Sequence, residues 1–140
     1  MNFLFVFLLS LAGSIVGAQD SWKVCLDKKV LLTTSTEDVE KNIINISSAD
    51  LKKNKSLVVS YKQVAPQKGW ERSISIYTEK DEELQKQKGK NFVLKTSELK
   101  KLLEKNKRLK IFTTYLPTDP KMKAQIRVRR VHLCTLVLQS

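Results

Sequence analysis

Short segments in which apolar and polar side chains alternate constrain the fold of this chain more than any other feature. In residues 70–77 the side chains of Trp70, Arg72, Ile74 and Ile76 alternate with Glu71, Ser73, Ser75 and Tyr77. A period of two is typical of a β-strand with one buried face. Similar segments predict strands at residues 22–27, 30–32, 44–46, 57–62, 92–94, 109–116 and 125–138, and a hairpin or loop at 81–90. Residues 131–138 are apolar on both faces, which indicates a central strand.

One helix is expected among these strands, at residues 97–105. Thr96 or Ser97 can cap it, and Leu99, Leu102 and Leu103 follow at helical spacing. Seven to eight short strands with one short helix predict an all-β chain, folded as an antiparallel β-sandwich of the immunoglobulin-like kind. Such sandwiches often carry a small helix in one crossover connection. A small β-barrel is the alternative fold, because the same number of strands can close on themselves.

Residues 1–18 carry no charged side chain and predict a cleaved signal peptide. An apolar run over residues 3–11 is followed by small residues, and Val16-Gly17-Ala18 fits a signal-peptidase site. The run is short for a hydrocarbon layer of about 30 Å, and an uncleaved membrane anchor is the alternative. We therefore expect cleavage before Gln19 and a secreted or periplasmic protein. Its residues 19–140 would form a single domain with no transmembrane span.

The mature chain contains two cysteines, Cys25 and Cys134. In an exported protein a lone pair predicts one disulfide, because a zinc site needs four clustered ligands. The bridge would close a loop over nearly the whole mature chain. It therefore requires the first and last strands to lie close together. Two unpaired buried thiols are the alternative.

Basic residues outnumber acidic ones by 26 to 14, which gives a net charge of +12. Residues 81–140 hold 15 of the basic and 6 of the acidic side chains, so the excess concentrates in the second half. Such a surface attracts polyanions, and the expected partner is an acidic glycan, a lipid head group or a protein. Nucleic acid is not expected, because only five of the basic residues are Arg. The candidate polyanion-binding residues are Arg127, Arg129, Lys107, Arg108, Lys110, Lys121 and Lys123. A basic surface that only keeps the protein soluble is the alternative.

Few residues of this chain suit catalysis. The one histidine, His132, lies in a predicted strand, where a packed structural role is usual. One His and two Cys are too few for a zinc or copper site, and the mature chain has no Gly-rich phosphate loop. We expect no metal, no cofactor and no catalytic residue, and therefore a non-catalytic binding or structural module. A small secreted hydrolase, whose two carboxylates are brought together by the fold, is the alternative function.

The motif Arg127-Val128-Arg129-Arg130 is similar to a basic-pair processing site. Proteolytic cleavage needs an extended and accessible loop, whereas these residues fall within the predicted last strand. The sequence therefore argues against processing at this motif.

Four short segments carry a resemblance to known proteins. They are Trp22-Lys23-Val24-Cys25-Leu26, Trp70-Glu71-Arg72, Tyr115-Leu116-Pro117-Thr118-Asp119-Pro120 and Ile126-Arg127-Val128-Arg129-Arg130-Val131-His132-Leu133-Cys134. In these segments the chain resembles a group of small exported single-domain proteins of unknown function from Gram-negative bacteria. The resemblance covers most of the mature chain and implies export as one domain. It implies no activity, ligand or catalytic residue.

Overall fold

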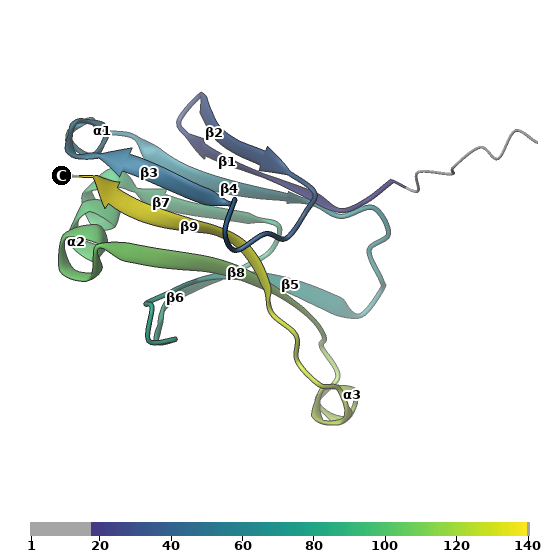
Figure 1. Cartoon of the computed structure of the whole chain (residues 1–140). Helices are drawn as coiled ribbons and strands as arrows, with labels where there is room; N and C mark the ends of the chain where they lie inside the picture. Colours follow the sequence, from purple (N-terminus) through teal and green to yellow (C-terminus); the bar gives the residue numbers. More distant parts are fainter. Residues whose placement is uncertain (1–17, 140) are drawn as a thin grey trace, which may run out of the picture.

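The computed structural model describes residues 18–139, which contain nine strands and three helices (Figure 1). The strands are β1 (Ser21–Leu26), β2 (Lys29–Thr34), β3 (Ile43–Ser47), β4 (Ser56–Lys62), β5 (Trp70–Tyr77), β6 (Glu83–Lys88), β7 (Asn91–Lys95), β8 (Arg108–Pro117) and β9 (Val131–Gln139). The helices are α1 (Ser48–Lys52), α2 (Thr96–Asn106) and α3 (Pro120–Gln125). The predicted signal peptide lies outside the described residues except for Ala18.

The strands form two sheets that lie face to face (Figure 1). One sheet has the order β2-β1-β4-β7, and the other has the order β3-β9-β8-β5-β6. All neighbouring strands are antiparallel except β3 and β9, which are parallel. The prediction of a mostly β chain with two sheets is confirmed. The barrel alternative is wrong for residues 18–139, because each sheet ends in two edge strands instead of closing on itself.

The hydrophobic core lies between the two sheets, and the alternation seen in the sequence explains its residues. Val24, Val59 and Phe92 point inward from the four-stranded sheet, and Ile74 and Ile111 point inward from the five-stranded sheet; all five are fully buried. Helix α2 covers one end of the sandwich with its buried leucines, Leu99 and Leu103. It connects β7 in one sheet to β8 in the other, as expected for a helix in a crossover connection.

The predicted disulfide between Cys25 and Cys134 is wrong, and both thiols are free. Cys25 lies on β1, which pairs with β2 and β4, whereas Cys134 lies on β9, which pairs with β3 and β8. The first and last strands therefore belong to different sheets. Cys25 is half-buried on the same strand face as the exposed Lys23, while Cys134 is fully buried in the core. The alternative of two unpaired buried thiols holds in full only for Cys134.

The predicted strand at residues 125–138 is correct only in its second half. Before β9 the chain forms α3 and then an irregular segment at residues 126–130. Pro117 ends β8, and the Asp119 carboxylate accepts a hydrogen bond of 2.9 Å from the Lys121 N–H and caps α3. Pro120 suits the first turn of a helix because its missing N–H would have no partner there. Residues 119–130, here called the basic arm, project from the five-stranded sheet (Figure 1).

A tight turn carries the chain from β6 in one sheet to β7 in the other. Gly89 has a φ of 108°, which lies in the left-handed region that favours glycine. Its N–H donates a 2.7 Å hydrogen bond to the Arg72 carbonyl on β5. The carbonyl of the next residue, Lys90, accepts a 2.8 Å bond from the Tyr61 N–H on β4. The turn is therefore fixed to both sheets, and this places Lys90 beside the end of β4.

Candidate functional site: a lysine-lined groove

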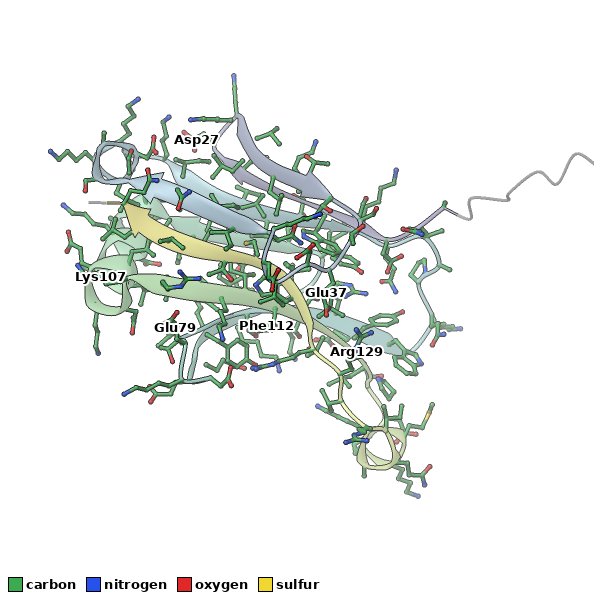
Figure 2. The ribbon with its side chains drawn as sticks, viewed as in Figure 1. Asp27, Glu37, Glu79, Lys107, Phe112 and Arg129 are labelled. Carbon is green, nitrogen blue, oxygen red and sulfur yellow. The ribbon has the colours of Figure 1, made fainter. Side chains whose placement is uncertain are left out.

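The seven basic residues predicted from the sequence fall into two separate groups. Arg127, Arg129, Lys121 and Lys123 lie in the basic arm, while Arg108 and Lys110 lie at the start of β8 and Lys107 directly precedes it, at the end of α2. Strands β8 and β9 are neighbours, but their antiparallel register pairs Arg108 with Val137 and Thr113 with Val131. The start of β8 therefore lies beside the end of β9, and the arm lies beyond the other end. Figure 2 shows Lys107 and Arg129 on opposite sides of Phe112.

Carboxylates partner most of the arginines on the five-stranded side of the molecule. Arg108 Nε lies 2.8 Å from Glu79 Oε1, and Arg130 Nη2 lies 2.7 Å from Asp81 Oδ1. Arg129 Nη2 lies 3.6 Å from Glu37 Oε1. These ion pairs reduce the positive potential that the sequence suggests for this region.

A sizeable hollow of the described residues lies on the opposite sheet. It has a volume of about 780 Å³ and is lined by Ser21, Trp22, Lys23, Thr33, Ser60, Tyr61, Lys62, Gln63, Pro66, Lys90 and Asn91. We call it the lysine groove, after Lys23, Lys62 and Lys90. The strands of this sheet contain four lysines and no acidic residue. A concave site of this size with convergent polar groups is the default place for a ligand.

Strand register brings the polar side chains of the groove together. Lys23 on β1 lies opposite Thr33 on β2 and Ser60 on β4, and Ser60 lies opposite Asn91 on β7. These four residues form one row across all four strands. Lys62 belongs to the neighbouring row, where it lies opposite Ser21, and Lys90 comes from the β6–β7 turn.

The groove lysines have no acidic partner in the described residues. The lining contains no Asp or Glu, and none of the three ammonium groups forms an ion pair within residues 18–139. Three like charges beside a hollow surface favour an anionic ligand, which would relieve their mutual repulsion. This is the opposite of the five-stranded side, where Glu37, Glu79 and Asp81 partner the arginines.

Packed aromatic rings make the end of the groove rigid. The Trp22 and Tyr61 rings stack almost parallel, with centroids 6.0 Å apart, and Trp22 Nε1 donates a 2.9 Å hydrogen bond to the Leu133 carbonyl. The Arg72 guanidinium lies 3.8 Å from the centroid of the Tyr61 ring and 4.8 Å from that of Tyr115. These contacts join the two sheets, so the groove rests on a fixed base.

Hydrogen bonds add to this base. The Tyr61 hydroxyl donates a 2.9 Å bond to the Asp20 carboxylate, and Arg72 Nη1 donates a 3.0 Å bond to Thr113 Oγ1. Burial, followed by the bond to Asp20, raises the pKa of Tyr61 to about 12. The hydroxyl therefore stays protonated and keeps donating throughout the physiological pH range.

Sequence reasoning missed the groove residues Lys23, Lys62 and Lys90. The available signal was modest: Lys23 and Lys62 occupy polar positions of two strands that contain no acidic residue. Only the pairing of β1 with β4, and of β4 with β7, shows that these positions converge.

No protein-family model, curated protein or solved structure matches this chain. Within residues 18–139, no helix is long and apolar enough to cross a lipid bilayer. The same residues contain no group of three His, Cys, Asp or Glu side chains that could hold a metal ion.

Proposed function

We propose that this protein is an exported, non-catalytic binding module that holds an acidic glycan in the lysine groove. The observation that carries the proposal is the groove itself, a hollow of about 780 Å³ with no acidic lining residue and with three lysines that form no ion pair within residues 18–139. Its ammonium groups would contact the carboxylate or sulfate groups of the glycan in charge-assisted hydrogen bonds.

The other lining residues support a glycan over a lipid head group or an acidic protein. Hydroxyl groups of Ser21, Thr33 and Ser60 and amides of Gln63 and Asn91 both donate and accept hydrogen bonds. A sugar chain presents many hydroxyl groups that need such partners. An open groove along a sheet also suits an extended chain better than a single compact head group.

The uncharged leader over residues 1–18 supports export to a secreted or periplasmic location. The resemblance to small exported proteins of Gram-negative bacteria supports the same location. The crossover of α2 between the two sheets supports an immunoglobulin-like assignment, whereas the parallel pairing of β3 with β9 departs from the antiparallel sheets of that fold. In this proposal the sandwich acts as a rigid frame and one of its outer faces carries the ligand.

Isothermal titration with a heparin-derived oligosaccharide tests the proposal. The groove variant Lys23→Gln/Lys62→Gln/Lys90→Gln is compared with a control, Lys107→Gln/Lys121→Gln/Lys123→Gln, which lowers the net charge by the same amount. Loss of three contacts worth about 0.5 kcal/mol each lowers the affinity of the groove variant about tenfold. The control is expected to bind nearly as well as the unchanged protein, and neutral dextran is not expected to bind.

Several results would contradict the proposal. Equal losses in both variants would show an effect of net charge alone, and a larger loss in the control would place the ligand at the sequence-predicted residues. Binding to phosphatidylglycerol vesicles but not to the oligosaccharide, lost in the groove variant, would identify a lipid head group as ligand. Shortening of the oligosaccharide during incubation would show a hydrolase.

A further inference from the structure

Three arginines lie within the four residues Arg127-Val128-Arg129-Arg130, in the irregular segment that joins α3 to β9. This placement removes the reason that argued against proteolytic processing, which was the predicted strand. Arg127, Val128 and Arg129 are exposed, and the side chain of Arg129 is 79% accessible. Exposed loop segments of this kind are the preferred sites of proteolytic nicking.

The basic arm can be opened without disturbing the core. Of residues 119–130, only Ile126 and Arg130 are half-buried, and the rest are exposed. Helix α3 has six residues, and none of them is buried. Residues 126–130 belong to no strand pairing in the described chain. A segment with so few buried contacts needs little free energy to unfold locally. Local unfolding is what lets a protease bind the segment in its active site.

The three arginines differ in how available they are to a protease. The Arg130 guanidinium lies 4.1 Å from the centroid of the Phe112 ring, and its Nη2 lies 2.7 Å from Asp81 Oδ1. Both contacts must break before a protease can bind the Arg130 side chain. A protease that cleaves after Arg129 must also hold the residues that follow, which means drawing Val131 out of β9. Cleavage after Arg127 needs only the exposed end of α3 to unwind.

We propose that the Arg127–Val128 bond is a processing site for an arginine-specific endoprotease, one whose primary pocket holds a guanidinium through a carboxylate. The reaction is hydrolysis by one water molecule. Its oxygen forms a bond with the Arg127 carbonyl carbon, and the carbon–nitrogen bond to Val128 breaks. Arg127 is left with a carboxylate and Val128 with a new amino group. One hydrogen of the water goes to the Val128 nitrogen, and the other leaves the new acid as a proton, which the amine takes up or the solution receives. This site is independent of the lysine groove.

The cleaved protein is expected to remain folded as two associated chains. Strand β9 lies inside the five-stranded sheet, where it pairs with the edge strand β3 on one side and with β8 on the other. Its side chains Leu133, Cys134 and Leu136 are fully buried in the core. The segment that begins at Val128 is therefore held by two hydrogen-bonded ladders and by hydrophobic contacts, although no disulfide links it to the rest.

Limited digestion of the folded protein with an arginine-specific endoprotease tests the site. The chain has five arginines, and the two outside the motif, Arg72 and Arg108, lie in strands. Intact-mass measurement is expected to show a first product that ends at Arg127. Arg127→Gln should lose this product, while the matched variant Arg129→Gln in the same segment should keep it. A first cut at any other arginine, or no cut under conditions that cleave the urea-unfolded chain, would overturn the proposal.

Size-exclusion chromatography of the digest tests the two-chain form. Both fragments should elute together at the volume of the uncut protein and separate in guanidinium chloride. Elution of the short fragment by itself in native buffer would show that β9 is released, and the expected two-chain form would then be wrong. Neither experiment uses a glycan, so their outcome and that of the groove experiment are read separately.

Discussion

The two cysteine side chains lie in contrasting environments, although neither is bonded to the other. Cys134 is fully buried among apolar side chains, and this burial raises the pKa of its thiol to about 12. Cys25 is half-buried on the outward face of β1. Because the thiolate is the reactive form, burial both hides Cys134 and keeps it protonated.

We therefore expect Ellman's reagent to modify one thiol of the folded protein quickly and the second only after unfolding. The fast thiol is Cys25, so Cys25→Ser should abolish the fast phase and leave the slow one. Absorbance at a mildly alkaline pH measures both phases. Two thiols of equal reactivity, or none before reduction, would contradict the structure.

His132 is buried on the outer side of β9. Its Nε2 lies 2.8 Å from Thr135 Oγ1, its ring meets Phe112 edge to face, and its backbone N–H donates to the Glu37 carboxylate. No partner for Nδ1 is found in residues 18–139. Burial lowers the pKa of His132 below its usual value of 6.5. The nearby Lys110 also lowers this pKa, whereas the Glu37 carboxylate raises it. The imidazole is therefore neutral in the folded protein near neutral pH.

This lowered pKa predicts a loss of stability in acid. Between the folded pKa and 6.5 the unfolded chain binds more protons than the folded chain. The free energy of unfolding should therefore be highest above pH 6.5 and fall below it, by at most about 1.4 kcal/mol per pH unit for this group. Urea unfolding of the protein and of His132→Gln over this range measures it. The proposal for His132 fails if the variant keeps the same slope.

At the level of elements, the sequence predicted best where alternation and burial agree. Strand β5 was predicted at its observed bounds, and β4, β8 and α2 within one residue at each end. Their apolar positions face the core, so the period in the sequence is the period of burial. The same signal misled at residues 126–129, where Ile126 and Val128 alternate with arginines. Residues 127–130 would lie opposite residues 114–117 of β8 if the β8–β9 register continued, but the pairing stops at Val131, and the chain before it leaves the sheet.

Strand β6 shows the converse case. Its sequence is mostly polar and was predicted only as a hairpin or loop, because an exposed edge strand needs no apolar face. One of its side chains also protects the edge of the other sheet. Gln87 Nε2 donates a 2.8 Å hydrogen bond to the Val93 carbonyl on β7, and Gln87 Oε1 accepts a 3.0 Å bond from the Val93 N–H. The amide thus occupies the backbone groups that another strand would use.

Gln87→Ala should therefore expose the β7 edge. We expect faster hydrogen exchange of the Val93 amide and a loss of stability of about 0.5–1.5 kcal/mol, since the bonds are partly exposed to water. Gln85→Ala, two residues earlier on the same strand, is the control, because its side chain forms no hydrogen bond in the described structure. Exchange measured by NMR distinguishes them. Equal protection of Val93 in both variants would show that Gln87 does not guard this edge.

At the scale of the whole molecule, strand order limited what could be predicted. The number of strands, the crossover helix and the excess of positive charge are properties of single segments. The cysteine pairing, the separation of the seven basic residues and the lysine groove depend on which strands are neighbours. That choice depends on packing between residues far apart in the chain, as for Trp22 and Leu133, and one sequence does not reveal it.

The net charge of +12 predicts that salt stabilises the folded protein. Repulsion among unpaired lysines opposes the compact state, and salt at about 0.15 M shortens the screening length to about 8 Å from about 30 Å at 0.01 M. The surface ion pairs lose little, because each contributes only about 0–1 kcal/mol. We therefore expect the thermal midpoint to rise between these concentrations, and to rise less in Lys23→Gln/Lys62→Gln/Lys90→Gln. A midpoint that falls with salt would mean that the ion pairs outweigh the repulsion.

The position of β9 between β3 and β8 also has a consequence for the export that we propose. A polypeptide that emerges N-terminus first would deliver β3 long before β9, and β8 shortly before it, although β9 lies between these two strands. Until residues 131–139 follow, β3 has no strand to pair with in the five-stranded sheet, and Trp22 lacks the carbonyl to which it donates. If the chain is exported as we propose, the five-stranded sheet would therefore be completed only when translocation is almost finished.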